Sequence, residues 1–221
     1  MNTFIDVFLE QVRAYPDRPA VMDARGAITY TGLNRRSALL AGKILESFHS
    51  SAQAGNNSAR VALLLPRRCD YLIALLAVVR AGCAVVPLDA EYPPERIQAI
   101  QEDAGCRLFI TTGALAEKAG DVPKLLIEDT PEKEAEADEI LNLSRAELEG
   151  LLVYTSGSTG KPKGAIHRQS VFSHYYTLNK MANRPLPPDA VHCCMAGFTF
   201  IAALFDLTIP IMTGGASLHR Q

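Results

Sequence analysis

The chain has 221 residues, of which 48% are hydrophobic and 21% charged, a globular composition that excludes disordered and fibrous proteins. Its 22 lysines and arginines against 24 acidic residues give a net charge of −2, which excludes the basic surface typical of proteins that bind nucleic acids or anionic membranes. We therefore expect no nucleic acid and no membrane among its partners, and a chain of this length can bury a core without disulfides or a structural metal.

The first 58 residues are predicted to contain two helices and two short strands. Apolar residues at helical spacing follow a cap at Thr3, and a loop rich in Ser, Ala, Gly and Asn over 49–58 closes this part. The predicted elements are a helix over Phe4–Val12, strands over Ala20–Met22 and Ala27–Thr29, and a helix over Leu33–Leu45. The loop suggests two sub-lobes, 1–58 and 59–221, within one domain.

From residue 60 onward, short apolar runs alternate with helical patterns. This alternation predicts an α/β fold with a largely parallel sheet flanked by helices. The acidic stretch 128–139 is interpreted as a solvated loop or an exposed helix face. The predicted strands cover 61–65, 83–86, 108–111, 125–127, 151–154 and 191–195, and the predicted helices cover 70–80, a segment from Pro94, and 170–181.

The cysteines and the N-terminus bear on the cellular compartment of the protein. The five cysteines are odd in number and lack C-x-x-C spacing, which favours buried free thiols over disulfides or a metal site. His192 precedes Cys193 and Cys194, but neighbouring strand residues point to opposite faces, so we expect no metal there. The N-terminus lacks a secretory leader, and no apolar run approaches the roughly 18 residues of a membrane span. These features predict a cytoplasmic protein.

The densest chemical signal is the segment from Tyr154 to Gly164, Tyr-Thr-Ser-Gly-Ser-Thr-Gly-Lys-Pro-Lys-Gly, which follows an apolar strand. Its glycines let backbone N–H groups approach an anion, its hydroxyls donate hydrogen bonds to phosphate oxygens, and its lysines offset negative charge. A polyphosphate is the ligand that this composition favours, and an ordinary flexible loop is the alternative. The segment is not a Walker P-loop, because Pro162 follows Gly160-Lys161 and Thr155 stands where that motif needs glycine.

This segment resembles the phosphate-binding motif of the adenylate-forming enzymes, in particular the adenylation domains of nonribosomal peptide synthetases. Two further segments resemble motifs of that family in the same order: Ile28–Asn34, with Gly32 in place of an acidic residue, and Arg80–Asp89 followed by Tyr92–Ile97. The resemblance covers essentially all 221 residues. It implies a partial N-terminal subdomain of an adenylation domain, without the C-terminal subdomain, and we expect such a fragment to be inactive alone.

Enzymes of that family join a carboxylate to the α-phosphate of ATP, release pyrophosphate and pass the acyl group to a carrier-protein thiol. The resemblance therefore implies ATP and Mg²⁺ as cofactors. It implies as partners a small carboxylic acid, a carrier protein with a phosphopantetheine arm, and the C-terminal part of the same enzyme. It implies no catalytic side chain in this part, because the substrate's own carboxylate attacks. The residues that it assigns to the β- and γ-phosphates are Thr155, Ser156, Gly157, Ser158, Thr159, Gly160, Lys161 and Lys163.

The resemblance places the acid substrate against Ile201, Ala202 and Phe205, where the chain departs from the family. Relatives that activate amino acids have an aspartate at the position of Ile201, which pairs with the α-ammonium group of the substrate. An ammonium group opposite Ile201 would be an unpaired buried charge, at a cost of about 3 to 5 kcal/mol. We therefore expect an α-keto, hydroxy, aryl or fatty acid, or an amino acid anchored by a carboxylate elsewhere. The alternative is that Asp206 takes over the pairing.

Two other functions stay open. The chain could be a non-catalytic scaffold or assembly module that retains the fold, or part of an acyl-CoA ligase-type enzyme, which the sequence Tyr-Pro-Pro-Glu-Arg at 92–96 disfavours. We assign Tyr30, Asp89 and Arg96 to structural roles. His167 is expected at a helix start or on the surface.

Overall fold

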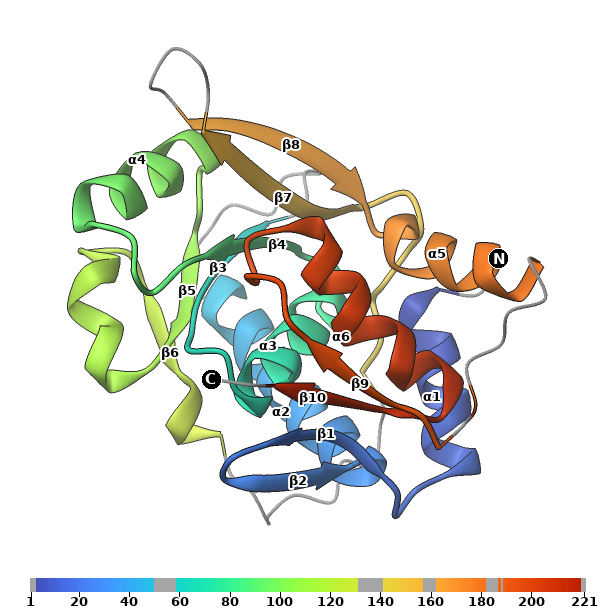
Figure 1. Cartoon of the computed structure of the whole chain (residues 1–221). Helices are drawn as coiled ribbons and strands as arrows, with labels where there is room; N and C mark the ends of the chain where they lie inside the picture. Colours follow the sequence, from blue (N-terminus) through green and yellow to red (C-terminus); the bar gives the residue numbers. More distant parts are fainter. Residues whose placement is uncertain are drawn as a thin grey trace.

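The computed structural model describes residues 3–49, 59–130, 141–156, 162–181, 187 and 189–219 (Figure 1). These residues form two sheets with helices packed between and around them. The α/β fold class predicted from the sequence is confirmed. The division of the strands into two separate sheets is a feature that the strand patterns did not predict.

The larger sheet has six strands, in the order β6 (Lys124–Leu126), β5 (Leu108–Thr111), β3 (Arg60–Leu64), β4 (Ala84–Leu88), β7 (Glu149–Ser156) and β8 (Pro162–Arg168). Its paired strands are parallel except for β7 and β8, which form an antiparallel hairpin. The central strands are continuous apolar runs because both faces of the sheet are covered.

The smaller sheet has four strands, in the order β2 (Gly26–Thr29), β1 (Pro19–Asp23), β10 (Ala216–His219) and β9 (Val191–Cys194). Strand β1 pairs in parallel with β10, with Val21 opposite Ser217. The sheet therefore combines strands from both segments proposed as sub-lobes, 1–58 and 59–221. Tyr30 stabilises this junction, because its buried hydroxyl donates a 2.7 Å hydrogen bond to the carbonyl of Gly215.

Two helices cover opposite faces of the six-stranded sheet. Helix α3 (Cys69–Arg80) belongs to the same core as Val61 and Leu63 of β3, whereas α4 (Pro94–Ala104) belongs to the core that contains Ala62 and Leu64. Successive strand residues point to opposite faces, so the two helices lie on opposite sides. Helix α3 also contacts β1, which places it between the two sheets.

The remaining elements are α1 (Phe4–Ala14), α2 (Tyr30–His49), α5 (Ser170–Met181), α6 (Ile201–Thr213) and the short 3₁₀ helices η1 (Gly113–Ala119) and η2 (Ile127–Asp129). Thr3 caps α1 as predicted, since its hydroxyl accepts from the backbone N–H of Asp6 while the Asp6 carboxylate accepts from that of Thr3. Within the described ranges, no helix is long and apolar enough to cross a membrane. Residues 131–139 of the acidic stretch lie outside the described residues.

Candidate functional site

The segment predicted to bind phosphates connects the two strands of the β7–β8 hairpin (Figure 1). Thr155 of β7 lies opposite Lys163 of β8, and Ser156 lies opposite Pro162. Directly opposed residues of an antiparallel pair have their side chains on the same face, so the hydroxyl of Thr155 and the ammonium group of Lys163 share a side of the hairpin. Both residues are exposed. Gly157, Ser158, Thr159, Gly160 and Lys161 lie outside the described residues.

Tyr154 holds the end of this hairpin that lies next to residues 157–161. Its hydroxyl donates a 2.6 Å hydrogen bond to the Asp103 carboxylate in α4. Its ring lies across Gly164, where an added Cβ would come within 3.0 Å of the Tyr154 Cζ and 3.2 Å of the Leu152 Cδ1. Gly164 is therefore required for close packing under the aromatic ring. Burial, followed by the hydrogen bond to Asp103, raises the pKa of Tyr154, so the phenol stays protonated as a donor.

The far end of the hairpin carries an ion pair of its own. Glu149 at the start of β7 accepts from the Arg60 guanidinium at 3.0 Å, which joins β7 to the start of β3. The same guanidinium donates to the carbonyl of Ala104 at 2.8 Å. The carboxylate of Glu149 is thus occupied at the end of the hairpin away from residues 157–161, while Lys163 is exposed at the end next to them.

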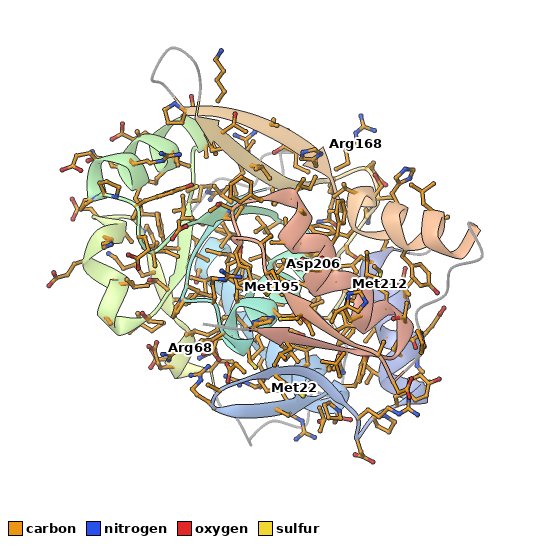
Figure 2. All side chains as sticks on the ribbon, in the orientation of Figure 1. Met22, Arg68, Arg168, Met195, Asp206 and Met212 are labelled. Carbon is orange, nitrogen blue, oxygen red and sulfur yellow. The ribbon has the colours of Figure 1, made fainter. Side chains whose placement is uncertain are left out.

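The residues predicted to bind the acid lie on the first turns of α6. Ile201 and Phe205 are half-buried and Ala202 is exposed. Residues four apart on a helix share a face, so Ile201 and Phe205 form one apolar stripe. Phe200 and Met195, just before the helix, are 66% and 68% exposed, so apolar side chains continue beyond the helix start. Figure 2 labels Met195, which precedes the helix, and Asp206, which lies on α6.

Asp206 lies on a different side of α6 from Ile201. Asp206 follows Ile201 by five residues, so their side chains point about 140° apart around the helix axis. Asp206 follows Ala202 by four residues, about one turn, so these two residues share a side of the helix. The carboxylate is half-buried, and burial raises its pKa while the nearby His192 opposes that shift. A ligand group that contacts Asp206 would therefore approach over Ala202 and away from Ile201.

The structure brings the predicted residues together in two groups. Thr155 and Lys163 belong to the six-stranded sheet, and Ile201, Ala202 and Phe205 lie on a helix that packs against the four-stranded sheet. His167, expected at a helix start or on the surface, is half-buried inside β8 opposite Leu151. The helix start is wrong, because the strand continues to Arg168 and α5 begins only at Ser170. The contact of Asp103 with the hairpin was missed, because 51 positions separate it from Tyr154 and no local pattern connects them.

The five cysteines are predicted to be buried free thiols, and the burial holds for four of them. Cys69, Cys83, Cys106 and Cys194 are buried, whereas Cys193 is exposed because neighbouring residues of β9 face opposite sides. Across the described ranges, no group of three or more His, Cys, Asp or Glu side chains could hold a metal ion.

Comparison with known proteins decides the family. A family model described as "AMP-binding enzyme" matches residues 8–220. The chain belongs to this family of AMP-binding enzymes. It is 32% identical over 215 residues to gramicidin S synthase 2 of Brevibacillus brevis, a match that covers 96% of this chain and 5% of that protein.

Solved structures of peptide synthetases have the same fold. The nonribosomal peptide synthetase FmoA3 matches with a TM-score of 0.84 and 19% identity, over 98% of this chain and 22% of that one. The N-terminal subdomain of Klebsiella oxytoca NpsA, in complex with 3-hydroxyanthranilyl-AMSN, matches with a TM-score of 0.77 and 22% identity. That match covers 99% of this chain and 53% of the NpsA subdomain, so this chain spans about half the length of that subdomain.

Proposed function

We propose that the protein carrying this chain joins a carboxylic acid to the α-phosphate of ATP and transfers the acyl group to the thiol of a carrier protein. The observation that carries the proposal is the family match over 8–220, which includes both the β7–β8 hairpin and the start of α6. The similarity to proteins named as peptide synthetases supports a carrier-bound phosphopantetheine thiol as the acceptor and the remainder of such an enzyme as a partner. Free thiols suit a cytoplasmic location.

The hairpin would hold the β- and γ-phosphates. Thr155 and Lys163 supply a hydroxyl donor and a positive charge on one face, and the sequence between them adds Ser158, Thr159 and Lys161 with two glycines. These groups would orient ATP and offset its charge while an oxygen of the acid attacks the α-phosphorus. The bond from that phosphorus to pyrophosphate then breaks. Because both reactants are anions, positioning and charge neutralisation supply most of the catalysis.

Mg²⁺ would enter with the nucleotide. Magnesium sites in enzymes commonly use substrate phosphates with one or two carboxylates, and they keep several waters. Such a site needs no preformed cluster of acidic side chains. The exposed Thr155 near the end of β7 is compatible with a hydrated ion bound to the phosphates.

The acid would lie along the stripe of Ile201 and Phe205. This surface offers no negative charge to an α-ammonium group, which favours a keto, hydroxy, aryl or fatty acid. The 3-hydroxyanthranilyl group named for the NpsA subdomain is an aryl acyl group, which supports this class. The alternative is an amino acid whose ammonium group reaches Asp206 over Ala202.

The test is exchange of labelled pyrophosphate into ATP by the whole protein that carries this chain, with and without added carboxylic acids. Acid-dependent exchange is the expected result. Absence of exchange with every acid would favour the scaffold or assembly module. Acid-dependent exchange followed by transfer to free coenzyme A, with no transfer to a carrier protein, would favour the acyl-CoA ligase type.

A further inference from the structure

A cavity of about 340 Å³ lies at the carboxyl ends of β3 and β4. Its charged lining residues follow these strands: Arg67 and Arg68 come after β3, and Asp89 and Glu91 come after β4. Phe198 forms an apolar wall on the segment before α6. The volume is at the lower end of the roughly 300 to 1,000 Å³ of small-molecule sites, so the cavity can hold a small metabolite.

The topology of the sheet explains why the cavity is there. Strands β3 and β4 are neighbours, but the chain leaves β3 into α3 on one face and leaves β4 into α4 on the other. The two segments diverge and leave a crevice between them. In open α/β sheets, crevices of this kind outside the carboxyl ends of the strands are the usual sites of ligand binding.

Among the described residues, the two arginines on the β3 side have no carboxylate partner. One terminal nitrogen of Arg67 donates to the carbonyls of Cys194 and Ala196 at 3.2 and 2.9 Å, and its guanidinium lies 5.3 Å from the centre of the Phe198 ring. Arg68 is the N-cap residue of α3, so it also lies at the positive end of the helix dipole. The Nε atoms of both arginines are buried without a hydrogen-bond partner within the described structure.

The two acids on the other side of the cavity also form no ion pair with any described residue. Asp89 accepts from the backbone N–H of Glu91 at 2.9 Å, which leaves its second carboxylate oxygen for another donor, and Glu91 is exposed. Within the part of the chain that the structure describes, no ion pair of 4.0 Å or less joins either arginine to either acid. Opposite charges thus line the same cavity without neutralising each other.

We propose that this cavity binds a small dipolar molecule, with an anionic carboxylate or phosphate monoester at Arg68 and an amine at Asp89 and Glu91. The ring of Phe198 would contact its apolar middle. A dipolar ligand can pair with the arginines and with the acids at the same time. A simple anion would be repelled by the two carboxylates, and a simple amine would be repelled by the two guanidinium groups. The proposal is independent of the acyl-transfer function.

The test is calorimetric titration of the whole protein, without ATP, using 6-aminohexanoate for the carboxylate and O-phosphoethanolamine for the phosphate monoester. We expect at least one probe to bind, and Arg68→Gln or Asp89→Asn to weaken binding by about tenfold or more, as for a lost charged hydrogen bond. Arg168→Gln, an exposed arginine on β8, should leave binding unchanged. Hexanoate and hexylamine, which each lack one charge, should bind more weakly than 6-aminohexanoate if that probe binds.

Several results would overturn the proposal. It is wrong if neither probe binds at about 10 mM, or if Asp89→Asn leaves the affinity of the bound probe unchanged. Equal affinity for hexanoate and 6-aminohexanoate would show an anion site without a role for the acids. If Arg68→Gln disturbs folding at the start of α3, Asp89→Asn and the exposed Glu91→Gln carry the test. No readout requires adenylation, so loss of the proposed function would leave this result interpretable.

Discussion

The hydroxyl of Tyr154 donates a 2.6 Å hydrogen bond to the carboxylate of Asp103, 51 positions earlier in the chain. It joins β7, the strand before the glycine-rich segment, to the end of α4, on one face of the six-stranded sheet. Because Gly164 lies directly under the same tyrosine ring, both strands of the hairpin are fixed at one point. The two strands that flank the proposed phosphate-binding segment are therefore fixed to α4.

Tyr154→Phe tests this anchor. The substitution keeps the ring over Gly164 and removes the hydrogen bond, and Asp103 is exposed enough for water to replace the donor. We expect a loss of about 0.5 to 1.5 kcal/mol in the free energy of unfolding, measured by chemical denaturation. Tyr92→Phe is the matched control, because its ring stacks with Arg96 at 4.2 Å and Phe retains that contact. Equal stability of the two variants would contradict the anchoring role.

Three glycines should differ in their tolerance of a methyl group. A Cβ at Gly150 would lie 2.7 Å from backbone atoms of Gln169, at Gly164 it would lie 3.0 Å from the Tyr154 ring, and at Gly113 it would meet nothing within 4 Å. We expect Gly150→Ala to cost about 1 to 3 kcal/mol, Gly164→Ala less, and Gly113→Ala least. Thermal or chemical denaturation of the three variants gives the order. A Gly150→Ala protein as stable as Gly113→Ala would refute it.

The lysines of the hairpin should act on ATP more than on the choice of acid. In the whole protein, Lys161→Ala or Lys163→Ala should reduce kcat/KM for ATP about tenfold or more, as expected for a lost charge-assisted hydrogen bond. Arg168→Ala, on the same strand but at the other end of the hairpin, should have little effect. If either lysine variant used ATP normally and changed which acid is accepted, the phosphate assignment would be wrong.

His219 predicts a dependence of stability on pH. Its side chain is buried on β10, and burial lowers its pKa from 6.5 to about 4. The unfolded chain then binds a proton at higher pH than the folded chain, so stability should fall as the pH falls from about 6.5 to 4. The shift corresponds to about 3 kcal/mol at most. His219→Leu should flatten this dependence, whereas His174→Gln, exposed on α5, should retain it. Identical pH profiles for all three proteins would contradict the assignment.

The sequence predicts the α/β class and most of the elements because their signals are local. Helix α1 has both apolar spacing and a cap at Thr3, and β5 and α5 begin and end at the predicted residues. The second sheet could not be predicted in this way. It depends on the parallel pairing of β1 with β10, which brings together residues almost 200 positions apart, Val21 and Ser217.

In the candidate site, too, the sequence predicts local patterns but not contacts between residues far apart in the chain. The hydroxyls, glycines and lysines near residue 160 form a local pattern, and the change from aspartate to Ile201 is visible within a motif. The contact between Tyr154 and Asp103, and the cavity between the segments after β3 and β4, arise from strand order and helix placement. The sequence context assigns Asp89 to a structural role, and no local pattern shows that Asp89 also lines the cavity.

The most direct test of the proposed chemistry is acid-dependent pyrophosphate exchange with matched acids that differ only at the α position, as keto, hydroxy or amino forms of one side chain. The whole protein should prefer a form without the ammonium group, and Ile201→Asp should shift relative kcat/KM toward the amino acid by about a hundredfold or more, the scale of an unpaired buried charge. A best substrate among ordinary α-amino acids, with exchange abolished by Asp206→Asn, would contradict the account and place the ammonium partner at Asp206.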